Sequence, residues 1–85
     1  MKKIKEIVVV EGKTDTQVLK ELFEVETIET QGLGLNEKTL EYIKKANETR
    51  GIIVLTDPDY PGMKIRNMIK DVVPNCKHAF VDRKD

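Results

Sequence analysis

Residues 52–62 read Ile-Ile-Val-Leu-Thr-Asp-Pro-Asp-Tyr-Pro-Gly, and this stretch decides how the rest of the chain is interpreted. Its first four residues are apolar and favour β-structure, which predicts a strand buried on both faces. Asp57 and Asp59 follow at the point where that strand should end. Pro58 cannot donate a backbone hydrogen bond to a neighbouring strand, and Pro61 suits the first turn of a helix. The two aspartates therefore belong to a short strand-to-helix loop, a part of open α/β sheets that carries function.

The two carboxylates of this loop suggest a binding site for a cation. Neighbouring carboxylates repel each other unless a positive charge lies between them. A cluster of oxygen ligands suits magnesium, a hard cation, better than zinc. The alternative interpretation is structural, because aspartates also form turns and cap helices.

The composition is that of a small globular domain. The chain has 85 residues, of which 39% are hydrophobic and 35% are charged, so we expect one domain at most. Basic and acidic residues number 15 each, and the formal net charge of +0 argues against a free-standing nucleic-acid clamp. The single Cys76 can form no intrachain disulfide, which favours a reducing cytoplasm. No apolar run approaches the length of a membrane span, so we expect no membrane partner.

Strands and helices are predicted to alternate along the chain. A second continuous apolar run at residues 7–10 predicts another central strand. The predicted strands are residues 5–10, 26–30, 52–56 and 76–81, of which the second and fourth are shorter or more polar. The predicted helices are residues 15–24, a helix between Asn36 and Gly51, and a helix from Pro61 or Gly62 to Pro74. Gly32 and Gly34 predict a flexible loop before the second helix.

Each predicted helix has one apolar face. Thr14 and Gln17 form a capping-box pattern at the start of the first helix. Asn36 is a favourable N-cap for the second, and Gly51 follows its end as a stop. The residues expected to face inward are Val18, Leu19, Leu22 and Phe23 in the first helix, Leu40, Ile43 and Ala46 in the second, and Ile65, Met68, Ile69 and Val72 in the third.

This alternation predicts an α/β fold, a Rossmann-like three-layer α/β/α arrangement around a four-stranded parallel sheet. The two fully apolar strands should lie side by side in the centre, which gives the strand order 2-1-3-4. Ligands bind beyond the carboxyl ends of such strands where the order switches direction, here between the first and third strands. Glu11 follows the first of these strands, so we expect it to converge with Asp57 and Asp59 on one crevice.

Glu11-Gly12 after the first strand and Asp57-x-Asp59 after the third resemble the Toprim domain of topoisomerases, bacterial primases and some nucleases. The resemblance covers nearly the whole chain and implies a Toprim-like fold. Four strings resemble one branch, ribonuclease M five, more closely: residues 9–15, 27–30, 50–62 and 74–80.

The ribonuclease M five family matures 5S ribosomal RNA in bacteria of the Bacillus type. The resemblance implies a magnesium-dependent endonuclease that cuts double-stranded precursor 5S rRNA, assisted by the ribosomal protein that binds 5S rRNA. Family members continue into a second, RNA-binding domain, whereas this sequence is read as a single Toprim domain over residues 1–85. We therefore expect either a catalytic domain without its C-terminal RNA-binding domain or a small stand-alone relative.

The residues of the predicted crevice have candidate roles in catalysis. Asp57 and Asp59 would bind Mg²⁺ directly or through water, so that the ion stabilises the reacting phosphate and helps to generate hydroxide. Glu11 would be either a metal ligand or the general base for the attacking water. The resemblance gives Asp15 a supporting role beside the ligands, although an acidic residue in the first turn of a helix is favoured by the helix dipole in any case.

Candidates for contact with the substrate are Lys13, Gly12, Gly62 and Lys64. Lys13 could reach a phosphate beside the metal or could be an ordinary solvated lysine. The two glycines could permit a close approach of the backbone or could simply form tight turns. Lys64 is expected on one helix with Arg66 and Lys70, where the three form either a solvated face or an RNA track.

Functions from other classes fit parts of the same pattern. A haloacid-dehalogenase-type phosphatase also carries Asp-x-Asp after a strand, but after its first strand, where this chain has Glu11. A receiver-like or non-catalytic module could hold magnesium, or bind nucleic acid, without turnover. Tyr60 is assigned to packing or RNA contact rather than to covalent catalysis, because the reactive tyrosine of topoisomerases comes from a separate domain. His78 is expected to be structural or exposed.

Overall fold

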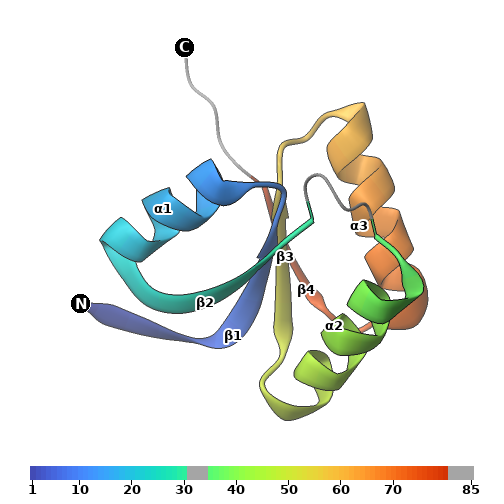
Figure 1. The fold of residues 1–85 in the computed structure, drawn as a ribbon, viewed down its shortest axis with the longest axis horizontal. Coiled ribbons are helices and arrows are strands. Elements are labelled where there is room, and N and C mark those ends of the chain that lie inside the picture. Colours follow the sequence, from blue (N-terminus) through green and yellow to red (C-terminus); the bar gives the residue numbers. More distant parts are fainter. Residues whose placement is uncertain (31–34, 81–85) are drawn as a thin grey trace.

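The computed structural model describes residues 1–30 and 35–80. In this part of the chain a four-stranded parallel sheet alternates with three helices (Figure 1). The strands are β1 (Lys2–Val10), β2 (Phe23–Glu29), β3 (Ile52–Thr56) and β4 (Lys77–Phe80). The helices are α1 (Lys13–Leu22), α2 (Glu37–Thr49) and α3 (Tyr60–Val72).

The order of the strands is β2-β1-β3-β4, which confirms the predicted α/β fold. Val8 of β1 pairs with Thr27 of β2 on one side and with Ile53 of β3 on the other. The pairing of β3 with β4 runs as far as Thr56 opposite Phe80. Because all these pairings are parallel, the carboxyl ends of the four strands lie along one edge of the sheet.

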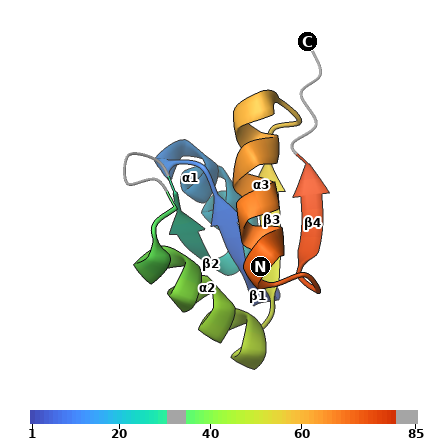
Figure 2. The ribbon, with the colours of Figure 1, turned by 90° about the vertical axis from the view of Figure 1, so that its right-hand side faces the viewer.

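Helices cover both faces of the sheet, with α1 on one face and α2 and α3 on the other (Figures 1 and 2). Ile7 and Val9 of β1 belong to the core that includes residues of α2 and α3, whereas Val8 and Val10 belong to the core beneath α1. Since successive side chains of a strand point to opposite faces, a strand covered on both sides needs an unbroken apolar run. This requirement explains the sequence of β1.

The ends and the apolar face of α2 agree with the sequence prediction. The Asn36 side chain caps the helix by accepting a hydrogen bond from the Thr39 N–H at 2.9 Å. Gly51 follows the helix with a φ of +93°, a left-handed conformation that suits glycine. Ile43 and Ala46 are buried, and Leu40 packs against them.

The third helix also begins and ends where the prolines predict. α3 contains Pro61 in its first turn, and its C-cap is Val73, directly before Pro74. Ile69 is fully buried, and Ile65 and Val72 pack against the same core. Met68 is half-buried.

The prediction for α1 is wrong in its bounds and its cap. The helix begins at Lys13 rather than Asp15 and ends at Leu22, because the next residue, Phe23, already pairs with β1 as the first residue of β2. Gly12 is the N-cap, and the Asp15 carboxylate accepts its N–H at 3.1 Å, so the predicted Thr14–Gln17 capping box does not form. Glycine has no side chain that could accept an N–H group of the first helical turn, and the Asp15 carboxylate instead accepts the N–H of Gly12 itself.

The apolar face expected for α1 is only partly used. Leu19 packs against the core beneath the helix, but Val18 is 50% exposed and Leu22 is 61% exposed. None of the ten residues of α1, all of which are described, is fully buried. A single short helix on this side of the sheet therefore contributes less buried surface than α2 and α3 do together.

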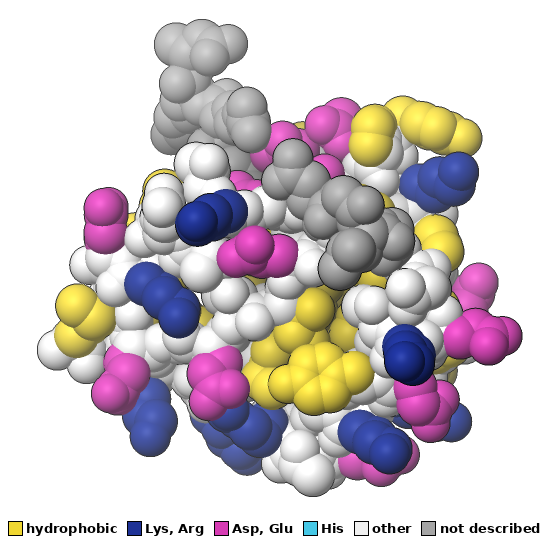
Figure 3. Space-filling view, viewed as in Figure 1, with side chains coloured by type: hydrophobic (Ala, Val, Ile, Leu, Met, Phe, Trp, Pro, Cys, Tyr) yellow, Lys and Arg dark blue, Asp and Glu magenta, His cyan; other side chains and the backbone are white. Residues whose placement is uncertain are grey.

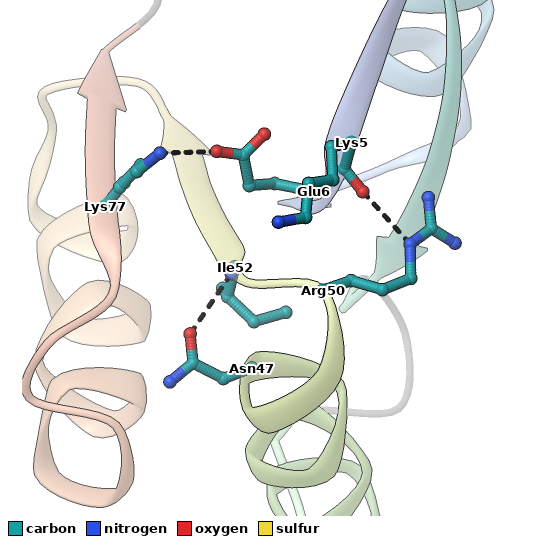
Figure 4. Close-up of polar contacts among 6 residues, drawn as sticks. All are labelled: Lys5, Glu6, Asn47, Arg50, Ile52 and Lys77. Atoms are coloured by element: carbon teal, nitrogen blue, oxygen red, sulfur yellow. Dashed lines mark hydrogen bonds and ion pairs between the residues drawn. The ribbon is translucent and has the colours of Figure 1, made fainter.

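Polar contacts hold the amino-terminal end of β3 (Figure 4). The Asn47 side chain accepts a hydrogen bond from the Ile52 N–H at 3.1 Å, which ties the start of β3 to α2. Arg50 donates from Nε to a backbone carbonyl of β1 at 3.0 Å. Lys77 of β4 forms an ion pair with Glu6 of β1. This contact joins the two strands that flank β3, close to the first residues of β3.

The predicted glycine loop and the end of the last predicted strand cannot be compared fully with the structure. The loop expected at Gly32 and Gly34 lies outside the described residues, as does Val81 at the end of the last predicted strand. The described part of that strand begins at Lys77, one residue later than predicted. Within residues 1–30 and 35–80, the helices are too short or too polar to cross a bilayer.

Candidate active site

A crevice of about 480 Å³ lies at the carboxyl-terminal edge of the sheet. Its walls come from the residues that directly follow β1, β2 and β3, and from the first turn of α1 and one side of α3. The lining residues are Glu11, Gly12, Thr14, Asp15, Thr30, Asp57 and Ile65. The crevice therefore lies at the switch in strand order, where the sequence predicted it.

Glu11 and Asp57 meet in this crevice. The Asp57 N–H donates to Glu11 Oε2 at 3.3 Å, although the two residues are 46 positions apart in the chain. The contact holds the Glu11 side chain over the start of the loop that follows β3. The pairing of β1 with β3 thus brings together two of the three acidic residues that were expected to converge.

Asp59 has a different position from Asp57. It is the N-cap of α3, and its Oδ1 accepts a hydrogen bond from the Gly62 N–H at 2.8 Å. It is exposed and does not line the crevice. Its carboxylate therefore has a structural role in starting α3, and one of its two oxygens is used for that role.

Gly62 is required by the close packing of α3 on the loop before it. A Cβ atom at this position would lie 2.3 Å from the backbone oxygen of Asp57 and 3.1 Å from Thr56 Oγ1. Such distances are too short for a methyl group. Gly62 is buried, and the close packing of α3 on this loop is sufficient to require a glycine at this position.

Asp15 lines the crevice and is anchored by its contact with Gly12. The Gly12 N–H donates to Asp15 Oδ2, which places the carboxylate beside the end of β1. Lys13 and Lys64 are exposed at the starts of α1 and α3, and neither is a lining residue. They lie on the elements that form the crevice, at positions from which long side chains can reach outward.

The donor atoms of the crevice fit a hard cation. Magnesium is usually held by one or two carboxylates together with water molecules, and Glu11, Asp57 and Asp15 all offer carboxylate oxygens in one space. Among the described residues, however, no three His, Cys, Asp or Glu side chains are close enough together to hold a single ion. The arrangement therefore suits a partly hydrated magnesium ion rather than a closed cage of protein ligands.

Acidic side chains are visible along the upper part of the molecule in Figure 3, on the side where the strands end. Basic side chains and further acidic side chains are scattered over the whole of that view, and the basic ones form no continuous band on this face. A surface of this kind offers few neighbouring contacts for a chain of phosphates.

Three lining residues were not predicted as parts of the site: Thr14, Thr30 and Ile65, the last of which was expected only on the apolar face of its helix. Thr30 follows β2 and is 4% exposed, and its backbone N–H and its hydroxyl both donate to the Val10 carbonyl. Thr14 lines the crevice from the first turn of α1. Thr30 could have been found by the same rule that identified Glu11, because it follows the carboxyl end of a parallel strand.

Arg66 contradicts the expectation of a solvated or RNA-facing helix surface. It is 4% exposed and reaches the ends of β3 and β4 with its guanidinium. Lys64 and Lys70 are exposed, so the three cations do not share one face. Tyr60 is 80% exposed, which leaves contact with other molecules, rather than packing, as its expected role.

The pKa values of Arg66 and of two side chains near it, His78 and Cys76, differ from their ordinary values. Burial lowers the pKa of the Arg66 guanidinium from its ordinary value, although an arginine remains charged at neutral pH. Burial, followed by the charges of Arg66 and Lys70, lowers the pKa of His78. Burial raises the pKa of the Cys76 thiol, so this buried cysteine is a poor candidate for a nucleophile.

We predict that Gly62→Ala destabilises the protein by about 1–3 kcal/mol, because the added methyl group must push α3 away from the Asp57 carbonyl. The free energy of unfolding in urea measures the effect, and the amide chemical shifts of Asp57 and Asp59 report the displacement of the loop. Asn67→Ala, at an exposed position of the same helix, serves as the control. Equal stability of the two variants would contradict the close packing.

We predict that the stability of the fold decreases on mild acidification because of His78, the single histidine of the chain. Its pKa is lower in the folded protein than its ordinary value of 6.5, so the unfolded chain takes up a proton first. The free energy of unfolding should therefore be highest above pH 6.5 and should fall as the pH is lowered toward the folded-state pKa.

Urea titrations at roughly pH 7.5 and pH 5.5 measure this dependence, since histidine is the side chain whose charge ordinarily changes in that range. His78→Gln should reduce the difference between the two stabilities. A variant that retained the full pH dependence would show that other groups cause it.

Comparisons with known proteins agree with this geometry. The family description "Toprim domain" matches residues 6–83. Ribonuclease M5 of Bacillus cereus is 51% identical over 83 residues, which are 98% of this chain and 44% of that protein. Ribonuclease M5 of Staphylococcus aureus is 54% identical over 81 residues, covering 95% of this chain and 46% of the relative. The corresponding protein of Bacillus subtilis is 51% identical over 81 residues, with 95% and 44% covered.

The chain thus spans less than half the length of these relatives, while nearly all of it aligns with them. The similarity extends over β1 and β3 and over both acidic segments that follow them. With a parallel sheet in the order β2-β1-β3-β4 and a family match over most of its residues, this chain belongs to the Toprim domain family.

Proposed function

We propose that this chain is the catalytic domain of a magnesium-dependent endoribonuclease that hydrolyses phosphodiester bonds in double-stranded precursor 5S rRNA. The observation that carries the proposal is the meeting of Glu11 with Asp57 at the carboxyl ends of β1 and β3. The similarity to proteins named Ribonuclease M5 supports the class of substrate, since that name denotes an enzyme that acts on RNA.

In this proposal Glu11 and Asp57 hold the magnesium ion, and Asp59 contributes through water from the start of α3. The ion supplies charge stabilisation for the reacting phosphate and activation of water. Asp15 lines the same crevice and adds negative charge beside the ligands. These residues are proposed as ligands because they lie at the edge of the sheet where the four parallel strands end.

Glu11 has two carboxylate oxygens, and only Oε2 accepts the Asp57 N–H. The other oxygen can bind the metal or accept a proton from the attacking water. Hydrolysis by water needs no covalent protein intermediate, which agrees with a role for Tyr60 outside the chemical step. Its exposure suits contact with RNA, because an exposed aromatic ring can stack on a base.

Recognition of the RNA is proposed to come largely from outside these 85 residues. The formal net charge is +0 and the crevice is acidic, so the domain by itself should attract RNA weakly. Lys13 and Lys64, exposed at the starts of α1 and α3, provide a few phosphate contacts. We propose that a second, RNA-binding domain of the intact protein and the ribosomal protein that binds 5S rRNA supply the remainder.

The cellular setting proposed for this activity is the cytoplasm. Cys76 is the single cysteine and is buried with a free thiol, as expected for a protein of a reducing compartment. An enzyme that acts on precursor 5S rRNA must also be present in the compartment where ribosomes assemble.

We predict that Glu11→Gln and Asp57→Asn lower the rate of cleavage of a precursor 5S rRNA duplex by roughly 10²- to 10⁴-fold, because each removes a charge from the site of the reaction. Single-turnover measurements with excess protein isolate the chemical step from weak RNA binding. Each reaction is run with magnesium and with a chelator.

Glu48→Gln on α2 and Asp71→Asn near the end of α3 are the matched controls, because both remove an exposed carboxylate far from the crevice. The proposal expects both controls to retain wild-type cleavage. Cleavage that persists in Glu11→Gln and Asp57→Asn, or that does not need a divalent cation, would contradict it. If the wild-type chain binds magnesium and RNA without cleaving, the non-catalytic alternative is correct.

A further inference from the structure

The side of α3 that packs against β3 and β4 includes a charged residue. Gly62, Arg66 and Ile69 are the buried residues of the helix, and they follow one another at helical spacing. A guanidinium is rarely this buried unless its donors are satisfied, because removing a charge from water is costly. The contacts of Arg66 therefore show what the residue holds in place.

Arg66 connects the ends of two strands. Nη2 donates to Thr56 Oγ1 at 2.8 Å and also to the carbonyl of Ala79, and Nη1 lies 2.8 Å from His78 Nδ1. The centre of the guanidinium lies 3.9 Å from the centroid of the Phe80 ring. Only Nε is buried without a hydrogen-bond partner among the described residues. The planar fork thus joins α3 to the last residues of β3 and β4 at once.

The contact with Arg66 determines which ring nitrogen of His78 carries the proton. Arginine can only donate hydrogen bonds, so Nδ1 of His78 must be the acceptor and its proton must be on Nε2. Nε2 lies 3.6 Å from the Cys76 sulfur, within reach of a weak hydrogen bond. A neutral histidine is therefore part of the same network.

This network lies directly beneath the acidic loop. Thr56, which accepts from Arg66, is the residue before Asp57. The same Thr56 Oγ1 is the atom that a side chain on Gly62 would approach to 3.1 Å. Gly62 and Arg66 are one helical turn apart, so both set the position of α3 against the end of β3. Because Asp57 directly follows β3 and Asp59 caps α3, this packing influences how the two carboxylates are placed relative to each other.

The opposite end of β3 is held by other residues. Asn47 binds the Ile52 N–H there, and Lys77 pairs with Glu6 (Figure 4). One end of the strand can therefore be loosened without removing the contacts at the other. This arrangement supplies a control for any effect of Arg66 on the site.

We propose that Arg66 is a positioning residue of the acidic site: its guanidinium fork, bonded to Thr56, His78 and Ala79, sets the geometry of the loop that carries Asp57 and Asp59. The effect on magnesium binding and cleavage rests on the proposed function, whereas the effect on the loop does not. A lysine keeps the charge but lacks the planar fork, so it cannot replace the three bonds.

The test compares Arg66→Lys, Arg66→Met and Asn47→Ala in the 85-residue chain. In the metal-free protein, both Arg66 variants should shift the amide resonances of Asp57, Asp59 and Gly62 and speed hydrogen exchange at Gly62, whose N–H binds Asp59. Titration with magnesium should then show a dissociation constant raised by about 10- to 100-fold, as is typical when the partners that orient metal ligands are removed. Asn47→Ala should lower stability and leave both readouts near those of the wild type.

Each outcome is decisive. An Arg66→Lys protein that matches the wild type in loop resonances and magnesium affinity overturns the proposal, because charge alone would then suffice. Equal effects of Asn47→Ala and Arg66→Met on the loop overturn it as well, since general loss of stability would explain them. If neither Arg66 variant folds, Thr56→Val removes one acceptor and keeps the arginine, and an unchanged loop in that variant also counts against the proposal. If the wild type binds no magnesium, the proposed function fails, while the metal-free resonances still test Arg66.

Discussion

The parallel pairing of β1 with β3 is the interaction on which the proposed site depends. Ile7 and Val9 pair with Ile52 and Val54, and all four side chains are at most 5% exposed. A shift of the pairing by one residue would exchange the side chains that pack beneath α1 with those that pack beneath α2 and α3, so the fit of the two cores favours the observed register. That register places Glu11 within hydrogen-bond distance of the Asp57 backbone. The hydrophobic core thus determines where the carboxylates meet.

The central part of this arrangement could be predicted from the sequence because its signals are local. Runs of branched apolar residues at 7–10 and 52–55 identify the buried strands, and their central position then fixes the strand order. Asn36 and Gly51 mark the ends of α2 by their own backbone and side-chain preferences. The acidic residues that follow these strands are brought to one edge by parallel topology alone.

What the sequence did not reveal depends on contacts between distant segments. The start of α1 is set by Asp15 accepting the Gly12 N–H, and its end is set by the pairing of Phe23 with β1. The burial of Arg66 depends on β4, a short strand whose residues have weak signals of their own. A pattern of charges on a helix cannot show which of them finds acceptors on a neighbouring strand. The sequence pattern therefore predicted Arg66 on the exposed side of its helix, whereas the residue is buried.

The distribution of charge suggests a division of labour in the proposed enzyme. Carboxylates line the crevice, the guanidinium of Arg66 is buried behind the loop, and the exposed lysines are scattered. A domain of this kind can position a metal and a water molecule, but it has little with which to hold a long RNA duplex. The greater length of the Ribonuclease M5 relatives leaves ample chain for that purpose in those proteins.

The most direct test of the central claim is the location of a divalent cation on this chain. Manganese can replace magnesium at oxygen-rich sites, and its unpaired electrons broaden the NMR signals of nearby amides. Substoichiometric manganese added to the isotope-labelled protein should broaden Gly12, Asp57 and Gly62 first, and excess magnesium should restore them. Broadening centred on other acidic residues, such as Glu21 and Glu24 or Glu41 and Glu48, would contradict the claim that the carboxyl ends of β1 and β3 form the metal site.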